Sequence, residues 1–255
     1  MSQLFDLTGK VALITGASSG LGVQFAKALA KQGANIVIAA RRVEKLEAVK
    51  KEIESLGVEC LSVRCDVVNN EDIVSMVAEI KERFKKVDIL VNNAGIGGFV
   101  SATKQTDEHW LNMINLNLNS VYFVTREVGK LMIDQKYGKI INIGSLHSTV
   151  AMPGSPITAY NASKGGVAML TKSLANEWAR HNITVNTIAP AYFESEMTED
   201  VIGGEYFDNI VKTYCPMRRV GRPGELDGAL LYFASDASSY TTGQLLTVDG
   251  GWTTI

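Results

Sequence analysis

Short, continuously apolar runs alternate along the chain with longer segments in which apolar residues recur every three or four positions. Continuous hydrophobicity, rather than strict alternation of apolar and polar residues, is typical of parallel strands covered on both faces. We therefore predict seven strands. They are Val11–Thr15, Asn35–Ala40, Cys60–Cys65, Ile89–Asn92, Ile140–Gly144, Thr184–Ile188 and Leu245–Val248.

The segments between these runs have the periodicity of helices, as in Gly20–Gln32, Val43–Leu56 and Glu71–Phe84. Strands that alternate with helices form right-handed crossovers between parallel neighbours. The pattern thus predicts an α/β fold, with a Rossmann-type doubly wound parallel sheet of about seven strands and helices on both faces. No linker rich in proline or serine divides the 255 residues, so we expect one domain over residues 1–255.

The segment 194–218 interrupts this rhythm. It begins with polar and acidic residues, contains Gly203-Gly204 and ends after Cys215-Pro216. An insertion between a strand and the next helix is a candidate substrate lid. The alternative is an ordinary pair of surface helices.

Composition excludes several classes of protein. A formal net charge of -2 gives no basic surface for nucleic acid, and no apolar run is long enough for a membrane span. The first ten residues lack the apolar stretch of a signal peptide. The odd count of three cysteines argues against a disulfide framework, and no histidine or cysteine spacing fits zinc. We expect buried thiols, no metal and a cytoplasmic location.

The segment Thr15–Gly22 follows the first predicted strand and opens the first helix. Its three glycines suit a dinucleotide-binding loop: Gly16 for a tight turn, Gly20 for close approach of a pyrophosphate, and Gly22 for packing of helix on strand. The helix N-terminus adds free N–H groups for the anion. The spacing GxxxGxG differs from the commoner GxGxxG, so its position between strand and helix carries the interpretation.

The second strand ends in Arg41 and Arg42, where an NAD-binding loop usually has a carboxylate for the ribose 2′-hydroxyl. Guanidinium groups suit a 2′-phosphate, because they form bidentate, charge-assisted hydrogen bonds. The sequence therefore favours NADP(H) over NAD(H). The alternative is that Arg41 and Arg42 are solvated side chains at the start of the next helix.

Tyr160 and Lys164 are four residues apart in a segment with helical periodicity, so their side chains share one face. A nearby ammonium favours phenolate, and we expect it to lower the pKa of Tyr160 from its usual value of about 10. Tyr160 then becomes a usable general acid and base near neutral pH.

These motifs together resemble the short-chain dehydrogenase/reductase family over essentially the whole chain. The matching residues are Thr15–Gly22, Asp66, Asn92–Gly95, Asn117, Ser145, Tyr160, Lys164 and Asp249–Gly251. The resemblance implies that Tyr160 exchanges a proton with the substrate oxygen and that Lys164 contacts the nicotinamide ribose. It implies that Ser145 orients the substrate oxygen, and that Asn117 holds a water chain leading to Lys164.

The resemblance also implies cofactor contacts. Asp66 and Val67 would meet adenine, while Asn93, Ala94 and Gly95 would line the cofactor. The remaining expected contacts are Ser18, Ser19, Leu21, Pro190, Ala191, Phe193 and Ser195. For Asn93 and Asp66, the alternative role is stabilisation of the carboxyl edge of the sheet. The choice of Asn117 among neighbouring asparagines rests on the family pattern alone.

Two residues are expected to face the substrate besides Ser145 and Tyr160, namely His147 and Tyr192. A plain loop role for His147 remains open, and His109 and His181 are expected on the surface. The chain departs from the family pattern in three places: the separation between Ser145 and Tyr160 is slightly long, Ala191 stands where glycine is usual, and Ser195 stands where a threonine usually binds the carboxamide.

The reaction expected from the resemblance is interconversion of a small-molecule ketone and a secondary alcohol. The chain resembles the bacterial branch that contains gluconate 5-dehydrogenases and 3-oxoacyl-carrier-protein reductases. A sugar acid such as gluconate is the first expectation, and a carrier-linked 3-oxoacyl group is the second. The second would need a basic patch such as Arg218, Arg219 and Arg222. Two further alternatives are a dinucleotide sensor without catalytic activity and a methyltransferase with a Rossmann fold. Neither function would explain why Tyr160 and Lys164 are present together.

The resemblance further implies a homotetramer that uses the long central helices and the C-terminal strand at subunit contacts. The apolar run Ala229–Ala234 and the ending Gly250–Ile255 are compatible with this assembly. Packing within one subunit would give the same pattern.

Overall fold

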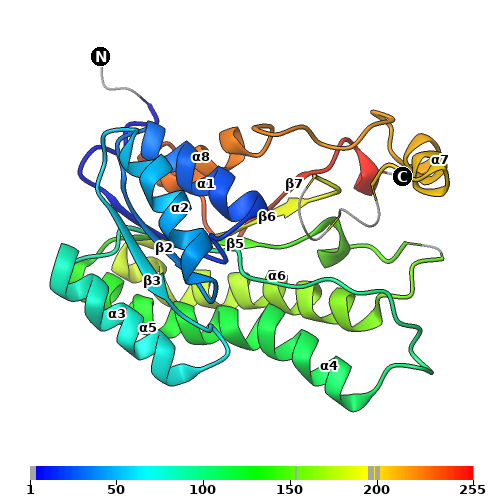
Figure 1. Cartoon of the computed structure of the whole chain (residues 1–255), viewed down its shortest axis with the longest axis horizontal. Coiled ribbons are helices and arrows are strands. Elements are labelled where there is room, and N and C mark those ends of the chain that lie inside the picture. The colour runs from blue at the N-terminus through cyan, green and yellow to red at the C-terminus, as the bar shows by residue number, and fades with distance from the viewer. Residues whose placement is uncertain (1–3, 153, 195–197, 199–201, 255) are drawn as a thin grey trace.

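The computed structural model describes residues 4–152, 154–194, 198 and 202–254. A parallel sheet runs through it in the order β3-β2-β1-β4-β5-β6-β7 (Figure 1). The strands are β1 (Val11–Thr15), β2 (Asn35–Ala40), β3 (Cys60–Arg64), β4 (Ile89–Asn92), β5 (Gly138–Ile143), β6 (Ile183–Pro190) and β7 (Leu245–Val248). The seven strands predicted from apolar runs, and their parallel arrangement, are confirmed.

Helices cover both faces of this sheet, which confirms the doubly wound architecture. Helices α1, α2 and α8 pack on one face, and α3, α5 and α6 pack on the other (Figure 1). The helices are α1 (Gly20–Lys31), α2 (Val43–Glu54), α3 (Asn70–Phe84), α4 (Asp107–Ile114), α5 (Ser120–Gln135), α6 (Thr158–Trp178), α7 (Glu205–Tyr214) and α8 (Asp227–Ala234).

Strand β5 begins at Gly138, two residues before the predicted start at Ile140. Lys139 is almost fully buried, with its ammonium 3.7 Å from the carboxylate of Asp236 and 5.8 Å from the ring centre of Tyr137. A lysine is not expected in a buried strand, and its partner Asp236 is too far away in the sequence to be predicted. The sequence therefore did not indicate that Lys139 belongs to β5.

Strand β1 pairs with β2 on one side and with β4 on the other. The chain therefore adds β2 and β3 on one side of β1 and then crosses over to add β4 and the later strands on the other side. Such a switch point opens a crevice at the carboxyl ends of the strands, where ligands of doubly wound sheets bind. The glycine loop between β1 and α1 lies at this crevice.

A chain of buried side-chain hydrogen bonds ties the central strands to α5 and α6. Asn92 on β4 donates to Thr125 and to Asn142, each at 2.8 Å. Asn142 on β5 donates to Thr171 of α6 at 2.8 Å, and the Thr171 hydroxyl lies 2.7 Å from that of Thr187 on β6. Buried polar groups that are paired in this way fix the register of helix on sheet.

Helix α7 lies within the segment predicted as a lid. Its inward residues Phe207 and Val211 pack in a small apolar cluster with Leu146, Cys215 and Trp252. The cluster joins α7 to the turn after β5 and to the C-terminal end of the described chain. In the described part of the chain, no helix is both long and apolar enough to cross a membrane.

Candidate active site

The glycine loop has the backbone that its sequence predicted. Gly16 and Gly20 have φ values of +66° and +54°, in the left-handed region where a side chain is strained. A Cβ atom on Gly22 would lie 2.8 Å from the Cα of Ala17 and would collide with the Gly16 carbonyl oxygen. The start of α1 is therefore pressed against the loop, with its N-terminus at the switch point.

Asn93 ties this loop to the end of β4. Its side-chain amide donates to the carbonyl oxygens of Thr15 and Gly16 at 3.0 and 3.1 Å. In return, the Thr15 hydroxyl accepts hydrogen bonds from the backbone N–H groups of Asn93 and Ala94 at 3.1 and 3.2 Å. The Asn93 side chain thus stabilises the carboxyl edge of the sheet, which was the alternative role considered for it.

The two arginines after β2 differ in their contacts. Arg42 donates to the hydroxyl of Ser18 at 3.0 and 3.2 Å and to that of Ser19 at 2.7 Å. Both arginines are exposed, and Arg41 makes no side-chain hydrogen bond within the described residues, so its contact with the cofactor stays a prediction. The loop therefore gathers a guanidinium and two hydroxyls at the end of β2, a donor set that fits a phosphate.

The residues after β3 lie beside this crevice. Val67 is buried, and the backbone N–H of Asp66 donates to the Asp72 carboxylate at 2.9 Å. Asp66 itself accepts a hydrogen bond from the backbone of Val68 at 3.3 Å. The loop is thereby held in one conformation, and its contact with adenine stays a prediction.

Tyr160 and Lys164 share one face of α6, as their spacing predicted. The Lys164 ammonium donates to the carbonyl oxygen of Ile143 at 2.8 Å and lies 5.7 Å from the ring centre of Tyr160. Burial lowers the pKa of Lys164 to about 8, so this ammonium loses its proton far more readily than an exposed lysine.

The direction expected for the pKa of Tyr160 was wrong. Burial of the phenol raises its pKa, and a hydrogen bond with Ser145 lowers it by less. Sequence spacing gave the proximity of Lys164 correctly, but it could not show that the ammonium donates to the Ile143 carbonyl. Desolvation of the phenol therefore outweighs the hydrogen bond from Ser145.

Ser145 follows β5 and begins a tight turn that includes His147. The Ser145 hydroxyl accepts a hydrogen bond from the backbone N–H of His147 at 3.2 Å. The backbone N–H of Ser145 donates to the Ser148 hydroxyl at 3.2 Å. The His147 ring is buried and meets the Tyr160 ring edge-on, with 6.0 Å between their centres. The structure thus brings Ser145, His147 and Tyr160 together.

Asn117 is fully buried in a widened helical turn, where the N–H of Ser120 donates to the carbonyl of Asn115, five residues back. Its amide forms two hydrogen bonds of 2.9 Å with the backbone of Ile96, one in each direction. A Cβ atom on Gly95 would lie 3.1 Å from the Asn117 oxygen and 3.8 Å from the Lys164 ammonium. Asn117 therefore holds the loop after β4 beside Lys164.

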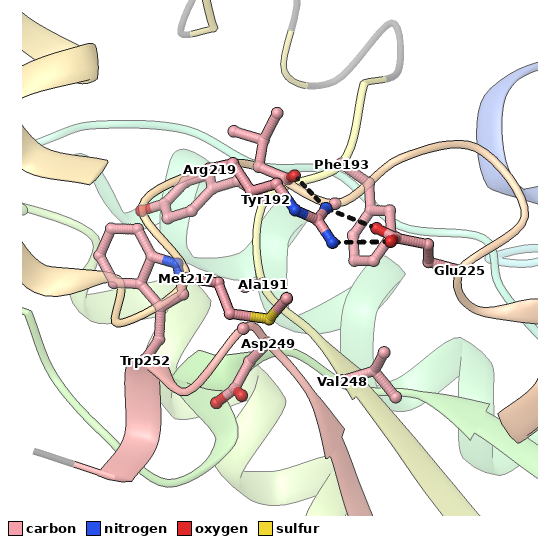
Figure 2. Close-up of a pocket in the computed structure, with 12 residues that line it drawn as sticks. Ala191, Tyr192, Phe193, Met217, Arg219, Glu225, Val248, Asp249 and Trp252 are labelled. Carbon is pink, nitrogen blue, oxygen red and sulfur yellow. Dashed lines mark hydrogen bonds and ion pairs between the residues drawn. The ribbon is translucent and has the colours of Figure 1, made fainter. Parts of the chain in front are cut away.

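A cavity of about 330 Å³ lies beyond the end of β6. Its walls include Ala191, Tyr192, Met217 and Trp252, and the bidentate ion pair of Arg219 with Glu225 lies at its edge (Figure 2). The remaining lining residues come from the segment after β6, from the end of β7 and the turn after it, and from the loop before α8. They are Phe193, Val220, Gly221, Val248, Asp249 and Gly250.

Tyr192 lies between this cavity and Tyr160, one of the predicted catalytic residues. Its ring packs between Phe207 of α7, at 4.8 Å, and Trp252, at 5.3 Å. Burial and the nearby Tyr160 both raise the pKa of Tyr192. Phe193 is buried, with its ring over Gly221, and Ser195 lies outside the described residues.

Comparisons with known proteins agree with this geometry. The family model described as Enoyl-(Acyl carrier protein) reductase matches residues 16–253. Gluconate 5-dehydrogenase of Gluconobacter oxydans is 40% identical over 98% of this chain and 97% of that protein. A 3-oxoacyl-[acyl-carrier-protein] reductase of Synechocystis is 38% identical over 96% of this chain and 97% of its own. The chain belongs to the short-chain dehydrogenase/reductase family.

A solved structure supports the same assignment. A gluconate 5-dehydrogenase from Burkholderia cenocepacia, in complex with NADP and tartrate, superposes with a TM-score of 0.95 at 37% identity, covering 99% of this chain and 98% of that one. As a member of the short-chain dehydrogenase/reductase family, the chain is an oxidoreductase. Within its described residues, no cluster of three or more histidine, cysteine or carboxylate side chains could hold a metal ion.

The sequence did not predict two of the contacts that position the site of this short-chain dehydrogenase/reductase. Ile96 supplies the backbone that pairs with Asn117, and Trp252 packs against Tyr192. Ile96 was expected only as part of a pocket wall, and Trp252 only as part of the chain ending. Neither contact could be predicted, because the first is made by a backbone and the second joins residues 60 positions apart.

Proposed function

We propose that this oxidoreductase uses NADP(H) to interconvert a ketone and a secondary alcohol, and that its substrate is a sugar acid of the gluconate type. The observation that carries the proposal is the meeting of Ser145, Tyr160 and Lys164 beside the glycine loop. The named relatives support the substrate class, because gluconate 5-dehydrogenases are among them.

The cofactor preference rests on Arg42 together with Ser18 and Ser19. A 2′-phosphate at the end of β2 would accept hydrogen bonds from this guanidinium and these hydroxyls, and a guanidinium binds an anionic phosphate more strongly than a neutral 2′-hydroxyl. Solved relatives with bound NADP support the same preference. The glycine loop would hold the pyrophosphate at the N-terminus of α1, and Ala94 and Gly95 would line the cofactor.

The protein residues supply proton transfer and orientation, while a bound nicotinamide supplies or accepts the hydride. During reduction, Tyr160 donates its proton to the carbonyl oxygen. The raised pKa of Tyr160 keeps the phenol protonated and ready to donate. The Ser145 oxygen accepts from the backbone of His147, and its hydrogen faces Tyr160, so this hydrogen can turn to a substrate oxygen held between the two hydroxyls. Lys164 lies 5.7 Å from the centre of the Tyr160 ring and would restore the proton through the water chain that Asn117 is expected to hold.

The alternative substrate, a carrier-linked 3-oxoacyl group, has weaker support in the structure. Its basic patch would need Arg219, but both terminal nitrogens of the Arg219 guanidinium donate to the Glu225 carboxylate, each at 2.7 Å. Of the three arginines considered, Arg218 and Arg222 would remain.

The test is reduction of 5-keto-D-gluconate, followed as loss of NADPH absorbance, with Tyr160→Phe as the matched control. We expect the wild type to turn over and the variant to lose about 100-fold or more in kcat. Activity that survives in Tyr160→Phe contradicts the proposed mechanism. Turnover of other ketones but not of the sugar acid contradicts only the substrate class.

We propose, in addition, that residues 1–255 form one domain and that the segment 194–218 acts as a lid over the substrate. We also propose that the protein is cytoplasmic and works as a homotetramer. Support for the lid comes from α7, which packs on Tyr192 through Phe207. All three cysteines are free and buried, in keeping with a reducing compartment. Exposed apolar residues on α4 to α6 support the assembly.

A further inference from the structure

His147 is a buried imidazole in contact with both hydroxyl-bearing residues of the site. Only 6% of the residue is exposed. Its ring meets the Tyr160 ring at 79°, and its backbone N–H donates to the Ser145 hydroxyl. A carbonyl oxygen held by Ser145 and Tyr160 therefore places the adjoining carbon atoms of its ketone close to this ring.

The hydrogen bonds of His147 determine which ring nitrogen carries the proton. Nδ1 lies 3.3 Å from the carbonyl oxygen of Val150, which can only accept, so Nδ1 carries the hydrogen. Burial lowers the pKa of His147 and keeps the ring neutral, which leaves Nε2 with a lone pair. Among the described residues, no side chain or backbone group donates to Nε2. Nε2 is not one of the fully buried polar atoms without a partner, but a substrate that covered it would desolvate it, which disfavours binding unless the substrate pairs with it.

We propose that Nε2 of His147 accepts a hydrogen bond from a substrate hydroxyl next to the reacting carbonyl, and so selects hydroxyketones over simple ketones. The inference rests on the proposed ketone reduction and deepens it. A hydroxyketone would satisfy Nε2 when its carbonyl oxygen reaches Ser145 and Tyr160. A ketone without the hydroxyl would bury Nε2 unpaired, which disfavours it.

Two substitutions separate the two nitrogens of the ring. In His147→Asn, the amide nitrogen can replace Nδ1 as the donor to Val150, but nothing reaches the position of Nε2. In His147→Gln, the longer side chain can return an acceptor oxygen close to that position. Both variants are checked for folding by their thermal unfolding temperature, and each is assayed with NADPH on acetoin and on 2-butanone, which differ by one hydroxyl.

We expect wild type to prefer acetoin in kcat/KM, and His147→Asn to lower that preference by about ten-fold, mainly through KM for acetoin. His147→Gln should recover part of it. An unchanged preference in a folded His147→Asn variant overturns the inference, as does an equal loss on both ketones, which would indicate a purely structural role. If wild type reduces other ketones but shows no preference for acetoin, the inference alone fails. Absence of any ketone reduction overturns the proposed function and the inference with it.

Discussion

At the scale of single residues, side-chain contacts distinguish neighbours that the sequence treats alike. Arg41 and Arg42 are adjacent and equally charged, yet Arg42 is the one that donates to Ser18 and Ser19. Spacing alone predicted both as phosphate ligands. The direction of a side chain at the start of α2 depends on where the glycine loop lies, and this is set by contacts between β1 and β4 rather than by local sequence.

This difference leads to a prediction on cofactor selectivity. Arg42→Ala should lower kcat/KM for NADPH by about 10- to 100-fold, because a charged pair with the 2′-phosphate is lost. The value for NADH should change by less than about three-fold, since NADH lacks that phosphate. Arg41→Ala is the matched control, with the same charge removed one residue away. Steady-state kinetics with both cofactors decide the matter, and a parallel loss for NADPH and NADH would mean that Arg42 only shapes the loop.

At the scale of elements, the strands were predictable because a parallel sheet buried on both faces needs continuous apolar runs. All seven were found from the sequence, while their ends were less accurate: β5 includes the buried Lys139, and β6 extends to Pro190. The site followed the same rule. Motif positions were predictable, but the pairing of Asn117 with Ile96 and the preference of Lys164 for the Ile143 carbonyl depend on distant segments.

The contribution of the buried hydrogen bonds between β5, β6 and α6 to stability can be tested by substituting two buried threonines. The Thr171 hydroxyl pairs with Asn142 and Thr187, whereas the buried Thr184 hydroxyl has no hydrogen-bond partner in the described structure. Thr171→Val should lower the free energy of unfolding by about 1–3 kcal/mol, because it leaves buried partners unsatisfied. Thr184→Val should be neutral or stabilising, since it removes a buried polar atom that gains nothing. Urea unfolding of both variants measures the difference, and equal losses would show that the network does not stabilise the fold.

At the scale of the whole molecule, several large apolar side chains remain exposed on the helices that the family resemblance assigns to subunit contacts. Trp110 and Leu111 on α4 and Tyr122 on α5 are each more than a third exposed, and Met169 on α6 is 61% exposed. A single exposed apolar residue needs no explanation, but a group on neighbouring helices marks an interaction surface. A lysine placed in such a surface would bring an unpaired charge into a desolvated contact.

The assembly can therefore be tested by charge substitution. Light scattering at micromolar concentration should give four times the 27.6 kDa mass of one chain. Leu111→Lys should shift the mass toward smaller species. The control is Val74→Lys, which changes a residue of equal exposure (54%) on α3, a helix outside the expected contacts, and should leave the mass unchanged. A monomeric wild type would reject the tetramer, and equal dissociation by both variants would show that the effect is general loss of stability. Because Leu111 lies on α4, just before the turn that holds Asn117, dissociation should also weaken the site, so kcat should fall together with the mass.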